Sequence, residues 1–193
     1  LLNDQTLDLT PDWLVIADDK RPLALAGIMG GADSGVTAGT VDILLESAFF
    51  DPAVIAGKSR ILGFGSESAY RFERGVDFAG ALPAIERATQ LILELCGGTA
   101  GPVCEAKAGL PARSPVKMRA SRAQRLLGIE LNERDIASLL HRLGFAFEAH
   151  GDDFLVAPPS YRFDLTIEED FVEEVARIHG YDNIPAKQPA GPM

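Results

Sequence analysis

The sequence predicts an α+β fold divided into two small domains. Short apolar runs bounded by turn residues are typical of strands, and longer stretches with a helical period of apolar residues separate and follow them. At 193 residues the chain is long enough for two domains with cores of their own. A break with the sequence GLPARSP marks the boundary. We expect a mixed α/β first domain over residues 1–108, a second domain over 109–185 and a linker over 186–193.

The composition is that of a globular protein, with 47% hydrophobic and 24% charged residues. No apolar run approaches the roughly 20 residues of a membrane-spanning helix, and the opening LLNDQTLDLT lacks the pattern of a signal peptide. Cys96 and Cys104 are too few for a disulfide framework, so we expect both to be reduced. We therefore expect a cytoplasmic protein without a membrane partner. Its net charge of −10 argues against indiscriminate nucleic-acid binding by the whole surface.

The first domain opens with a predicted β-hairpin. Residues 14–17 and 23–28 are expected to form two strands, joined through the polar segment DDKRP. Gly27, Gly30 and Gly31 crowd the end of the second strand, which indicates a sharp turn or a surface that another group approaches closely. These glycines do not form a phosphate-binding loop, because the pattern GxxxxGK[ST] is missing.

A buried strand is predicted next, over residues 41–50 with the sequence VDILLESAFF. Glu46 interrupts its apolar run. A buried carboxylate must be hydrogen-bonded or face a cavity, because burying it without a partner is costly. One explanation is an ion pair with an arginine such as Arg71 or Arg74, and the other is a binding pocket.

Capping signals predict helices later in the first domain. Asp51 and Pro52 are typical N-cap and first-turn residues for a helix that runs toward Leu62. A long amphipathic helix is expected from Asp77 to Gly97. Its expected buried stripe consists of Ile85, Ala88, Ile92 and Leu95.

Helices and a hairpin are also predicted for the second domain. Ser121 is expected to cap one helix, and Asn132 to cap another that ends at Gly144. The second of these helices carries an apolar stripe formed by Ile136, Leu139, Leu140 and Leu143. Residues 145–147 and 154–156 alternate as a hairpin. With a third helix near the C-terminus, the arrangement is winged-helix-like.

The third helix carries a cluster of carboxylates. Thr166 and Glu169 match a capping box that starts this helix near Ile167, and Gly180 is expected to end it. Its apolar face is formed by Phe171, Val175 and Ile178. The acidic residues fall on the opposite face or in the turn before it: Asp164, Asp170, Glu173 and Glu174.

Repulsion within this cluster has to be offset. A magnesium ion is one solution, because it takes oxygen ligands and is often held by one or two carboxylates with groups from elsewhere. The other is Arg177, which follows Glu173 by four residues and Glu174 by three and can pair across the same helix face. Spacing alone favours the arginine.

A basic stretch precedes the acidic helix. Residues 106–129 contain no acidic residue and carry the cations Lys107, Arg113, Lys117, Arg119, Arg122 and Arg125. They could contact the phosphates of a nucleic acid, or they could neutralise the acidic helix of the same domain. We favour neutralisation, because no aromatic residue that could stack on a base occurs in this stretch.

Long ungapped runs give the sequence a family resemblance. The chain is similar to the B-five domain of the bacterial phenylalanyl-tRNA synthetase beta subunit in YRFD, DFVEEVAR and GYDNIP. It resembles the C-terminal part of the editing domain of that subunit, B-three/B-four, in GIMGG, LLESAFFDP, SRILG and SAYRFERGVD. The resemblance extends over residues 14–185. It implies part of an enzyme, phenylalanine–tRNA ligase, which uses ATP to charge tRNA(Phe) with phenylalanine.

The resemblance also implies a metal and a partner. In the family a Mg²⁺ ion is assigned to four carboxylates at the positions of Asp164, Asp170, Glu173 and Glu174. The ion is shared with the alpha subunit of an alpha2beta2 heterotetramer. ATP and phenylalanine bind to the alpha subunit.

The family's editing domain hydrolyses tyrosine wrongly attached to tRNA(Phe). The residue at the position of Glu46 accepts the proton of the tyrosine phenol, and Gly27 and Gly30 match glycines that wall the pocket. Ser66 and Ser68 stand where many relatives have threonine and alanine. No histidine lies close in sequence to either serine, so we assign no catalytic residue and expect a positioned water to attack the ester.

Two other classes of function are considered beside the enzyme fragment. The winged-helix-like domain with its basic stretch would suit a nucleic-acid-binding module. A scaffold that only holds the alpha subunit would need neither an editing pocket nor bound tRNA.

Overall fold

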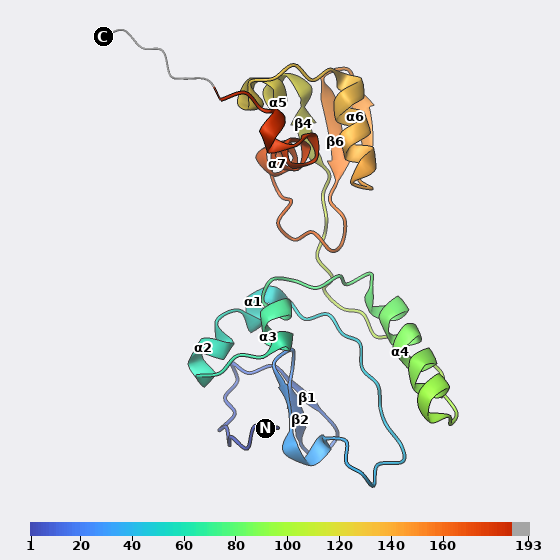
Figure 1. The fold of residues 1–193 in the computed structure, drawn as a ribbon. Coiled ribbons are helices and arrows are strands. Elements are labelled where there is room, and N and C mark those ends of the chain that lie inside the picture. The colour runs from blue at the N-terminus through green and yellow to red at the C-terminus, as the bar shows by residue number, and fades with distance from the viewer. Residues whose placement is uncertain (187–193) are drawn as a thin grey trace. The chain divides into compact units, whose positions relative to one another are not determined.

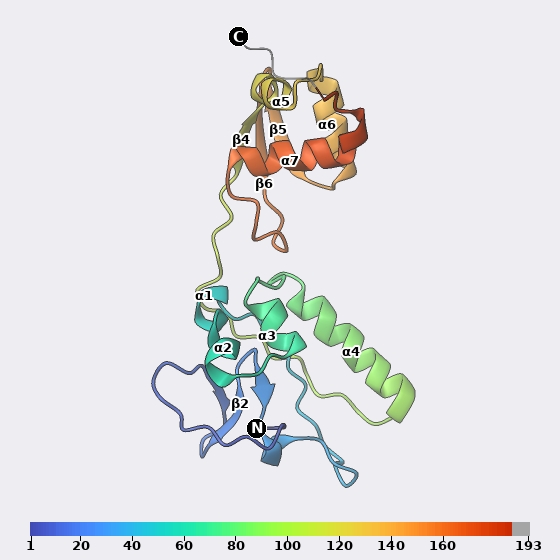
Figure 2. The same ribbon diagram turned by 60° about the vertical axis from the view of Figure 1, so that its left-hand side comes forward.

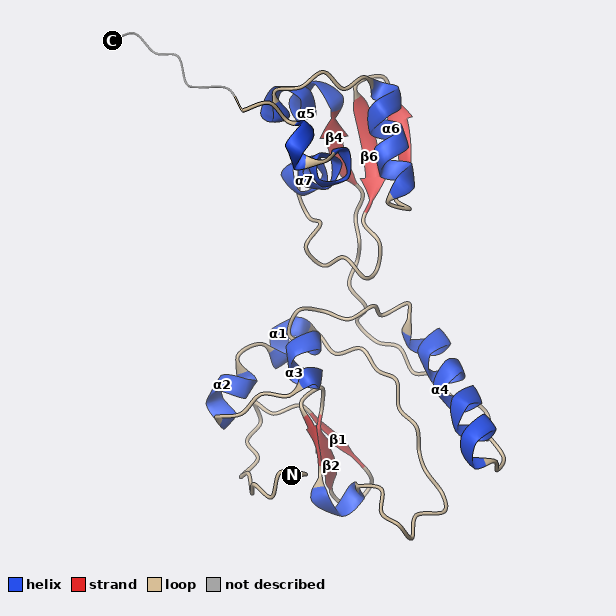
Figure 3. Cartoon of the chain, in the orientation of Figure 1, coloured by secondary structure: helices blue, strands red, loops and turns tan. Residues whose placement is uncertain are grey.

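The computed structural model describes residues 1–186 (Figure 1). It divides the chain into two compact units, Leu1–Leu110 and a second that begins at Pro111. Each unit combines helices with a small antiparallel sheet, which confirms the predicted α+β class (Figure 3). Apart from Ala186, the predicted linker lies outside the described residues. None of the helices within residues 1–186 is long and apolar enough to cross a membrane.

The first unit is built on a sheet with the strand order β1-β2-β3. Its elements are β1 (Val15–Ala17), β2 (Pro22–Leu25), β3 (Met29–Gly30), the 3-10 helix η1 (Ala32–Ser34), α1 (Pro52–Ile55), α2 (Lys58–Leu62), α3 (Glu67–Phe72) and α4 (Ala81–Cys96). β1 pairs antiparallel with β2, which confirms the predicted hairpin. The second strand ends earlier than expected, because the chain turns at Gly27 and returns as β3.

The core of the first unit gathers around the turn between β2 and β3. Gly27 has φ +67°, a conformation that favours glycine. A Cβ atom at this position would meet side-chain atoms of Phe50, Phe72 and Ile55 at 3.0, 3.2 and 3.3 Å. The predicted sharp turn at the glycines is therefore present, and side chains pack tightly against its backbone.

Two serines at the start of α3 hold this turn. The hydroxyl of Ser66 donates to the carbonyl of Ile28 at 2.6 Å and accepts from the amide of Ala69 at 3.0 Å. Ser66 is thus also the N-cap of α3. The hydroxyl of Ser68 donates to the carbonyl of Gly27 at 3.0 Å. Both serines therefore bind backbone of the same turn, from the same short helix.

The predicted buried strand at residues 41–50 is wrong. This segment forms no regular element and runs as loop between η1 and α1 (Figure 3). The side chains of Val41 and Leu44 are 91% and 96% exposed. An apolar run becomes a strand only where a neighbouring strand can take its hydrogen bonds, and none pairs with this segment within residues 1–186.

Two helical predictions need correction in the first unit. Asp51 does cap a helix that starts at Pro52, but α1 ends at Ile55 because Gly57 adopts φ +76° before α2 begins. α4 ends before Gly97 as predicted, yet none of its residues is fully buried. Leu95, the last member of the predicted buried stripe, is 82% exposed. The amphipathic pattern predicted this helix, but the helix begins at Ala81 rather than at Asp77, and no described element covers its apolar face fully.

The second unit has a sheet with the strand order β4-β6-β5. Its elements are β4 (Val116–Arg119), α5 (Ala120–Leu127), α6 (Glu133–Arg142), β5 (Ala146–His150), β6 (Asp153–Ala157), α7 (Glu168–His179) and the 3-10 helix η2 (Tyr181–Asn183). The predicted hairpin is confirmed as β5 and β6. Strand β4 was not predicted, because its alternation spans only a few residues beside the domain boundary.

The helices of the second unit share one core with its sheet (Figure 2). α7 packs against β4, α5 and α6. Phe171 and Val175 of α7 are fully buried together with Phe154 of β6 and Ile136 and Leu140 of α6. Asn132 caps α6 as predicted, through a reciprocal capping box with Asp135.

The predicted cap of α5 is wrong. Ser121 lies inside the helix, and the cap comes from Asp152 in the β5–β6 turn. The carboxylate of Asp152 accepts from the amide and the hydroxyl of Ser121 at 2.7 and 2.6 Å. These two hydrogen bonds, side chain and backbone, lower the pKa of Asp152 from its ordinary value of 3.8. Sequence alone gave no sign that a distant aspartate would reach this helix.

The serine contacts lead to a prediction about stability. Replacing Ser66 by alanine removes a partly buried hydrogen bond and a helix cap, so it should lower the unfolding free energy of the first unit by about 2 kcal/mol. Ser68→Ala removes one hydrogen bond and should cost about half as much. Trp13 is the single tryptophan and packs on this core, so urea unfolding followed by its fluorescence measures the effect. Equal losses for the two variants would contradict the assigned double role of Ser66.

The cap of α5 leads to a prediction about pH. Because the folded-state pKa of Asp152 is lowered, its contribution to stability is present above its ordinary pKa and is lost as pH falls through the folded-state value. Asp152→Ala should therefore speed amide exchange in the first turn of α5 by about fivefold at pH 7. The difference from the unchanged chain should shrink below about pH 4. A difference that does not depend on pH would argue against the carboxylate cap.

Candidate functional site

Four of the five residues predicted to form the editing pocket lie around the β2–β3 turn. Ser66 and Ser68 bind the carbonyls of Ile28 and Gly27. Gly30 follows in β3, where a Cβ atom would meet only the side chain of Leu2, at 3.0 Å from its Cδ1. Gly30 therefore has a flexible neighbour, whereas Gly27 is enclosed by ring and aliphatic side chains.

The fifth residue, Glu46, lies apart from any ion pair. Its side chain is exposed in the loop before α1 and contacts no hydrogen-bond donor among residues 1–186. The two arginines considered as its partners bind other acids, since Arg71 contacts Glu67 at 2.9 Å and Arg74 contacts Glu73. The ion-pair explanation for Glu46 is therefore wrong in this structure. The expectation that Glu46 is buried is also wrong, because the strand predicted to carry it does not form.

The two serine hydroxyls are structural donors in this arrangement. Each gives its proton to a backbone carbonyl, and neither has a histidine within the hydrogen-bond network that the structure describes. An activated serine nucleophile needs an adjacent general base, so the geometry does not support covalent catalysis here.

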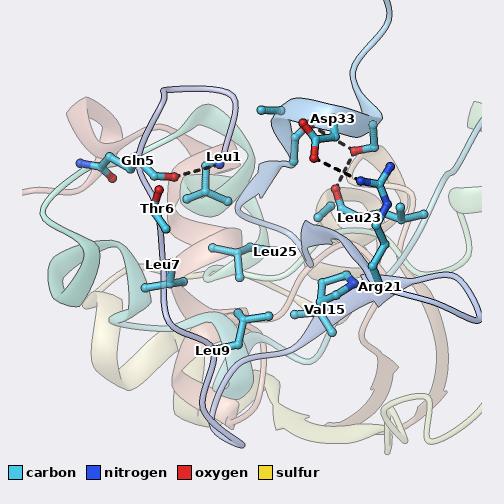
Figure 4. Close-up of a pocket in the computed structure, with 15 residues that line it drawn as sticks. Leu1, Gln5, Thr6, Leu7, Leu9, Val15, Arg21, Leu23, Leu25 and Asp33 are labelled. Atoms are coloured by element: carbon cyan, nitrogen blue, oxygen red, sulfur yellow. Dashed lines mark hydrogen bonds and ion pairs between the residues drawn. The ribbon is translucent and has the colours of Figure 1, made fainter.

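A cavity of about 260 Å³ lies beside this turn in the first unit (Figure 4). Its walls are mainly apolar and include Leu7, Val15 and Leu25. At its edge the guanidinium of Arg21 contacts the carboxylate of Asp33 at 3.1 Å. None of the five predicted pocket residues lines this cavity. Sequence analysis did not identify it, because its lining comes from several short segments that share no motif.

The carboxylates predicted to hold a metal meet an arginine instead. Arg162, in the loop between β6 and α7, contacts Asp164 at 2.6 Å and Glu174 at 3.0 Å. Arg177 contacts Glu174 at 2.6 Å, as the spacing on the helix predicted. Two carboxylates and two guanidinium groups thus form one ion-pair network, which we call the Arg162 network.

Glu174 is the buried member of the Arg162 network. Its side chain is 7% exposed, so the prediction that it lies on the solvent-facing side of α7 is wrong. Burial alone would raise the pKa of Glu174, but hydrogen bonds from Arg162 and Arg177 outweigh it and lower the pKa to about 2. The hydrogen bonds that Arg162 donates to the carboxylates of Asp164 and Glu174 in turn raise the pKa of Arg162. Glu174 is therefore a stable anion at neutral pH.

The other two carboxylates have different surroundings. The carboxylate of Asp170 accepts from the amides of Thr166 and Ile167 at 2.7 and 2.8 Å, so it caps α7. This corrects the capping box expected between Thr166 and Glu169. Glu173 is exposed to solvent. Within residues 1–186, no three acidic, histidine or cysteine side chains are grouped so that they could hold a metal ion.

The four carboxylates have suitable chemistry for Mg²⁺ but an unsuitable arrangement. The oxygen ligands have the chemistry that Mg²⁺ prefers, and two carboxylates do converge on one cationic group. That group is a guanidinium, and Asp170 and Glu173 do not join it. As they stand in this structure, the four carboxylates do not fit a metal ion.

Two cations of the basic stretch are neutralised by the acidic helix, and a third by a neighbouring strand. Arg119 contacts Glu168 at 2.7 Å, and Arg122 contacts Glu168 at 3.2 Å and also Glu169. Lys117 contacts Asp153 of the neighbouring strand at 2.5 Å. These ion pairs agree with the expected neutralisation within one domain. They involve three of the six cations of the stretch.

Arg162 is the residue at this site that sequence analysis missed. Only Arg177 was considered as a counter-ion, because helical spacing links it directly to the acids. A signal was present, since Arg162 stands two residues before Asp164 in the run YRFD. Recognising it required knowing that the loop folds back over α7.

Comparison with known families assigns both units. The family described as the B3/4 domain matches residues 1–97. The tRNA synthetase B5 domain matches residues 116–181. The two matches fall on either side of the boundary between the compact units.

Curated relatives match the whole chain. It is 58% identical over 193 residues to a phenylalanine–tRNA ligase beta subunit of Dechloromonas aromatica, covering 100% of this chain and 24% of the relative. It is 61% identical over 189 residues to the beta subunit of Nitrosospira multiformis, with 98% and 24% covered. The chain thus spans about a quarter of the length of these relatives. It belongs to the B3/4 domain family, continues into a tRNA synthetase B5 domain, and is similar throughout to phenylalanine–tRNA ligase beta subunits.

Proposed function

We propose that this chain acts as part of the beta subunit of a cytoplasmic phenylalanine–tRNA ligase. Its relatives are named phenylalanine–tRNA ligase beta subunits, and its two domains match the B3/4 and tRNA synthetase B5 families. The partners would be the alpha subunit and tRNA(Phe), with ATP and phenylalanine bound on the alpha subunit. We assign residues 1–108 to the C-terminal part of the editing domain and 109–185 to the B-five domain.

The first unit would contribute to the hydrolysis of tyrosine wrongly attached to tRNA(Phe). A site shaped for phenylalanine cannot strongly exclude an analogue that only adds a hydroxyl, so a second site has to recognise that hydroxyl. Glu46 would accept the phenolic proton of tyrosine. Gly27 and Gly30 would form the wall, and water would attack the ester.

The observation that supports this proposal best is the fixed turn. Ser66 and Ser68 hold the backbone that carries Gly27, so glycines and hydroxyls distant in sequence are brought together. Glu46 is exposed and free of ion pairs with described residues, so its carboxylate is available to a ligand. No described residue covers the Glu46 carboxylate, so a closed pocket around it would need side chains from outside residues 1–186.

The second unit would bind the alpha subunit. We propose that a Mg²⁺ ion is held there by Asp164, Asp170, Glu173 and Glu174 only after the partner has changed the surroundings of these acids. A nucleic-acid-binding module is less well supported, because ion pairs within the unit occupy Lys117, Arg119 and Arg122, three of the six cations of the basic stretch. A scaffold without editing activity is the remaining alternative.

Glu46 is the residue whose replacement tests the editing proposal. In the intact two-subunit enzyme, Glu46→Ala should slow deacylation of tyrosyl-tRNA(Phe) by about tenfold or more, because a hydrogen bond to a charged acceptor contributes about 1.5–3 kcal/mol. Charging with phenylalanine should stay unchanged. Glu67→Ala is a matched control, since Glu67 is an exposed acid of the same unit that pairs only with Arg71. Unchanged deacylation in Glu46→Ala would favour the scaffold.

Carboxylate replacements test the interface proposal. In the intact enzyme with magnesium present, Asp170→Asn and Glu174→Gln should each weaken association of the alpha and beta subunits by about tenfold or more. The first replacement removes a hydrogen-bonded carboxylate charge, and the second removes a buried one. Sedimentation velocity measures this association, and atomic absorption measures the metal content. Glu169→Gln is a control on the same helix. Assembly and metal content that stay the same in both variants would count against the site.

A further inference from the structure

Arg162 donates hydrogen bonds to two carboxylates at once. Its Nε and Nη2 donate to the two oxygens of Asp164 at 2.9 and 2.6 Å. Its Nη1 and Nη2 donate to the two oxygens of Glu174 at 3.0 and 3.1 Å. Four carboxylate oxygens therefore surround one guanidinium group, with the paired geometry that makes arginine–carboxylate contacts strong.

The charges of the Arg162 network balance. Two guanidinium groups, from Arg162 and Arg177, face two carboxylates, from Asp164 and Glu174. A buried carboxylate needs such compensation, because it has lost the solvation that water provides. A divalent cation added to this neutral group would meet two positive charges at close range, so it could bind only by displacing a guanidinium.

A second arginine holds the loop that delivers Arg162. The guanidinium of Arg113 lies over the ring of Phe163, 5.5 Å from its centre. It donates to the carbonyl of Arg162 and, at 3.4 Å, to the carbonyl of Leu165. The backbone on both sides of Asp164 is thus anchored to the start of the second unit, and Arg162 is held over Glu174.

We propose that Arg162 is a built-in counter-ion that occupies the Asp164–Glu174 pair and excludes a divalent cation from it in this chain. The inference deepens the proposed interface site and rests on that part of the proposed function. It separates a state without metal, in which Arg162 pairs with the carboxylates, from the metal-bound state proposed above. Release of one guanidinium would open four oxygens of the type that magnesium binds.

The test compares three forms of the 193-residue chain. These are the unchanged chain, Arg162→Gln, and the control Arg119→Gln, which removes an arginine that pairs with a different acid of α7. Mn²⁺ serves as the probe, and the electron paramagnetic resonance signal of the free ion reports its binding. Thermal unfolding with and without Mg²⁺, at matched ionic strength, gives a second readout.

The unchanged chain and Arg119→Gln should bind Mn²⁺ only weakly, and Mg²⁺ should leave their melting temperatures unchanged. Arg162→Gln should melt at a lower temperature without divalent ions, should recover part of the loss with Mg²⁺, and should bind one Mn²⁺ at least about tenfold more tightly. Adding Asp164→Asn to Arg162→Gln should remove the gained binding, since Asp164 is 63% exposed and can be changed without unfolding the unit.

The proposal would be overturned if Arg162→Gln folds and its Mn²⁺ affinity equals that of the unchanged chain. If Arg162→Gln does not fold, Arg162→Lys keeps the positive charge but loses the paired geometry, so it should fold and bind Mn²⁺ with an intermediate affinity. Arg162→Lys with the affinity of the unchanged chain would then refute the inference. Neither measurement uses the alpha subunit, so failure of this inference is distinct from failure of the interface proposal, which is tested by association of the two subunits.

Discussion

The first unit depends on two hydrogen bonds, which serine hydroxyls donate to the backbone of the Gly27–Ile28 turn. Ser66 and Ser68 belong to α3, so their hydrogen bonds tie this helix to the end of the sheet. Phe50, Ile55 and Phe72 pack against Gly27, and they can approach its backbone closely because glycine has no side chain. The wall of the candidate pocket is therefore a product of the packed core. It would be lost if the helix moved.

The second unit depends on the neutralisation of one buried carboxylate. Glu174 belongs to a helix whose apolar face completes the core, and its burial requires cations nearby. Arg177 comes from the same helix and Arg162 from the loop before it, so helix and loop are held together by charge. The same contacts explain why acids that resemble a metal site can be stable without an ion.

Local signals were sufficient for the class of the fold and for some of the helix ends. Asp51 and Asn132 act where their side chains can reach amides of their own helices, and such contacts follow from spacing alone. Errors arose where the deciding partner is distant in sequence. Residues 41–50 lack a neighbouring strand, Asp152 caps α5 from another turn, and Arg162 reaches Glu174 through a folded loop. The pocket residues were identified by family resemblance, and composition alone would not have selected them.

The most direct measurement of the central claim is the deacylation of two esters by the intact two-subunit enzyme and by this chain alone. If the β2–β3 turn forms part of an editing pocket, the intact enzyme should hydrolyse tyrosyl-tRNA(Phe) much faster than phenylalanyl-tRNA(Phe). The chain alone should show little of this preference, because Glu46 lies open to solvent in it. Equal rates for the two esters in the intact enzyme would contradict the account.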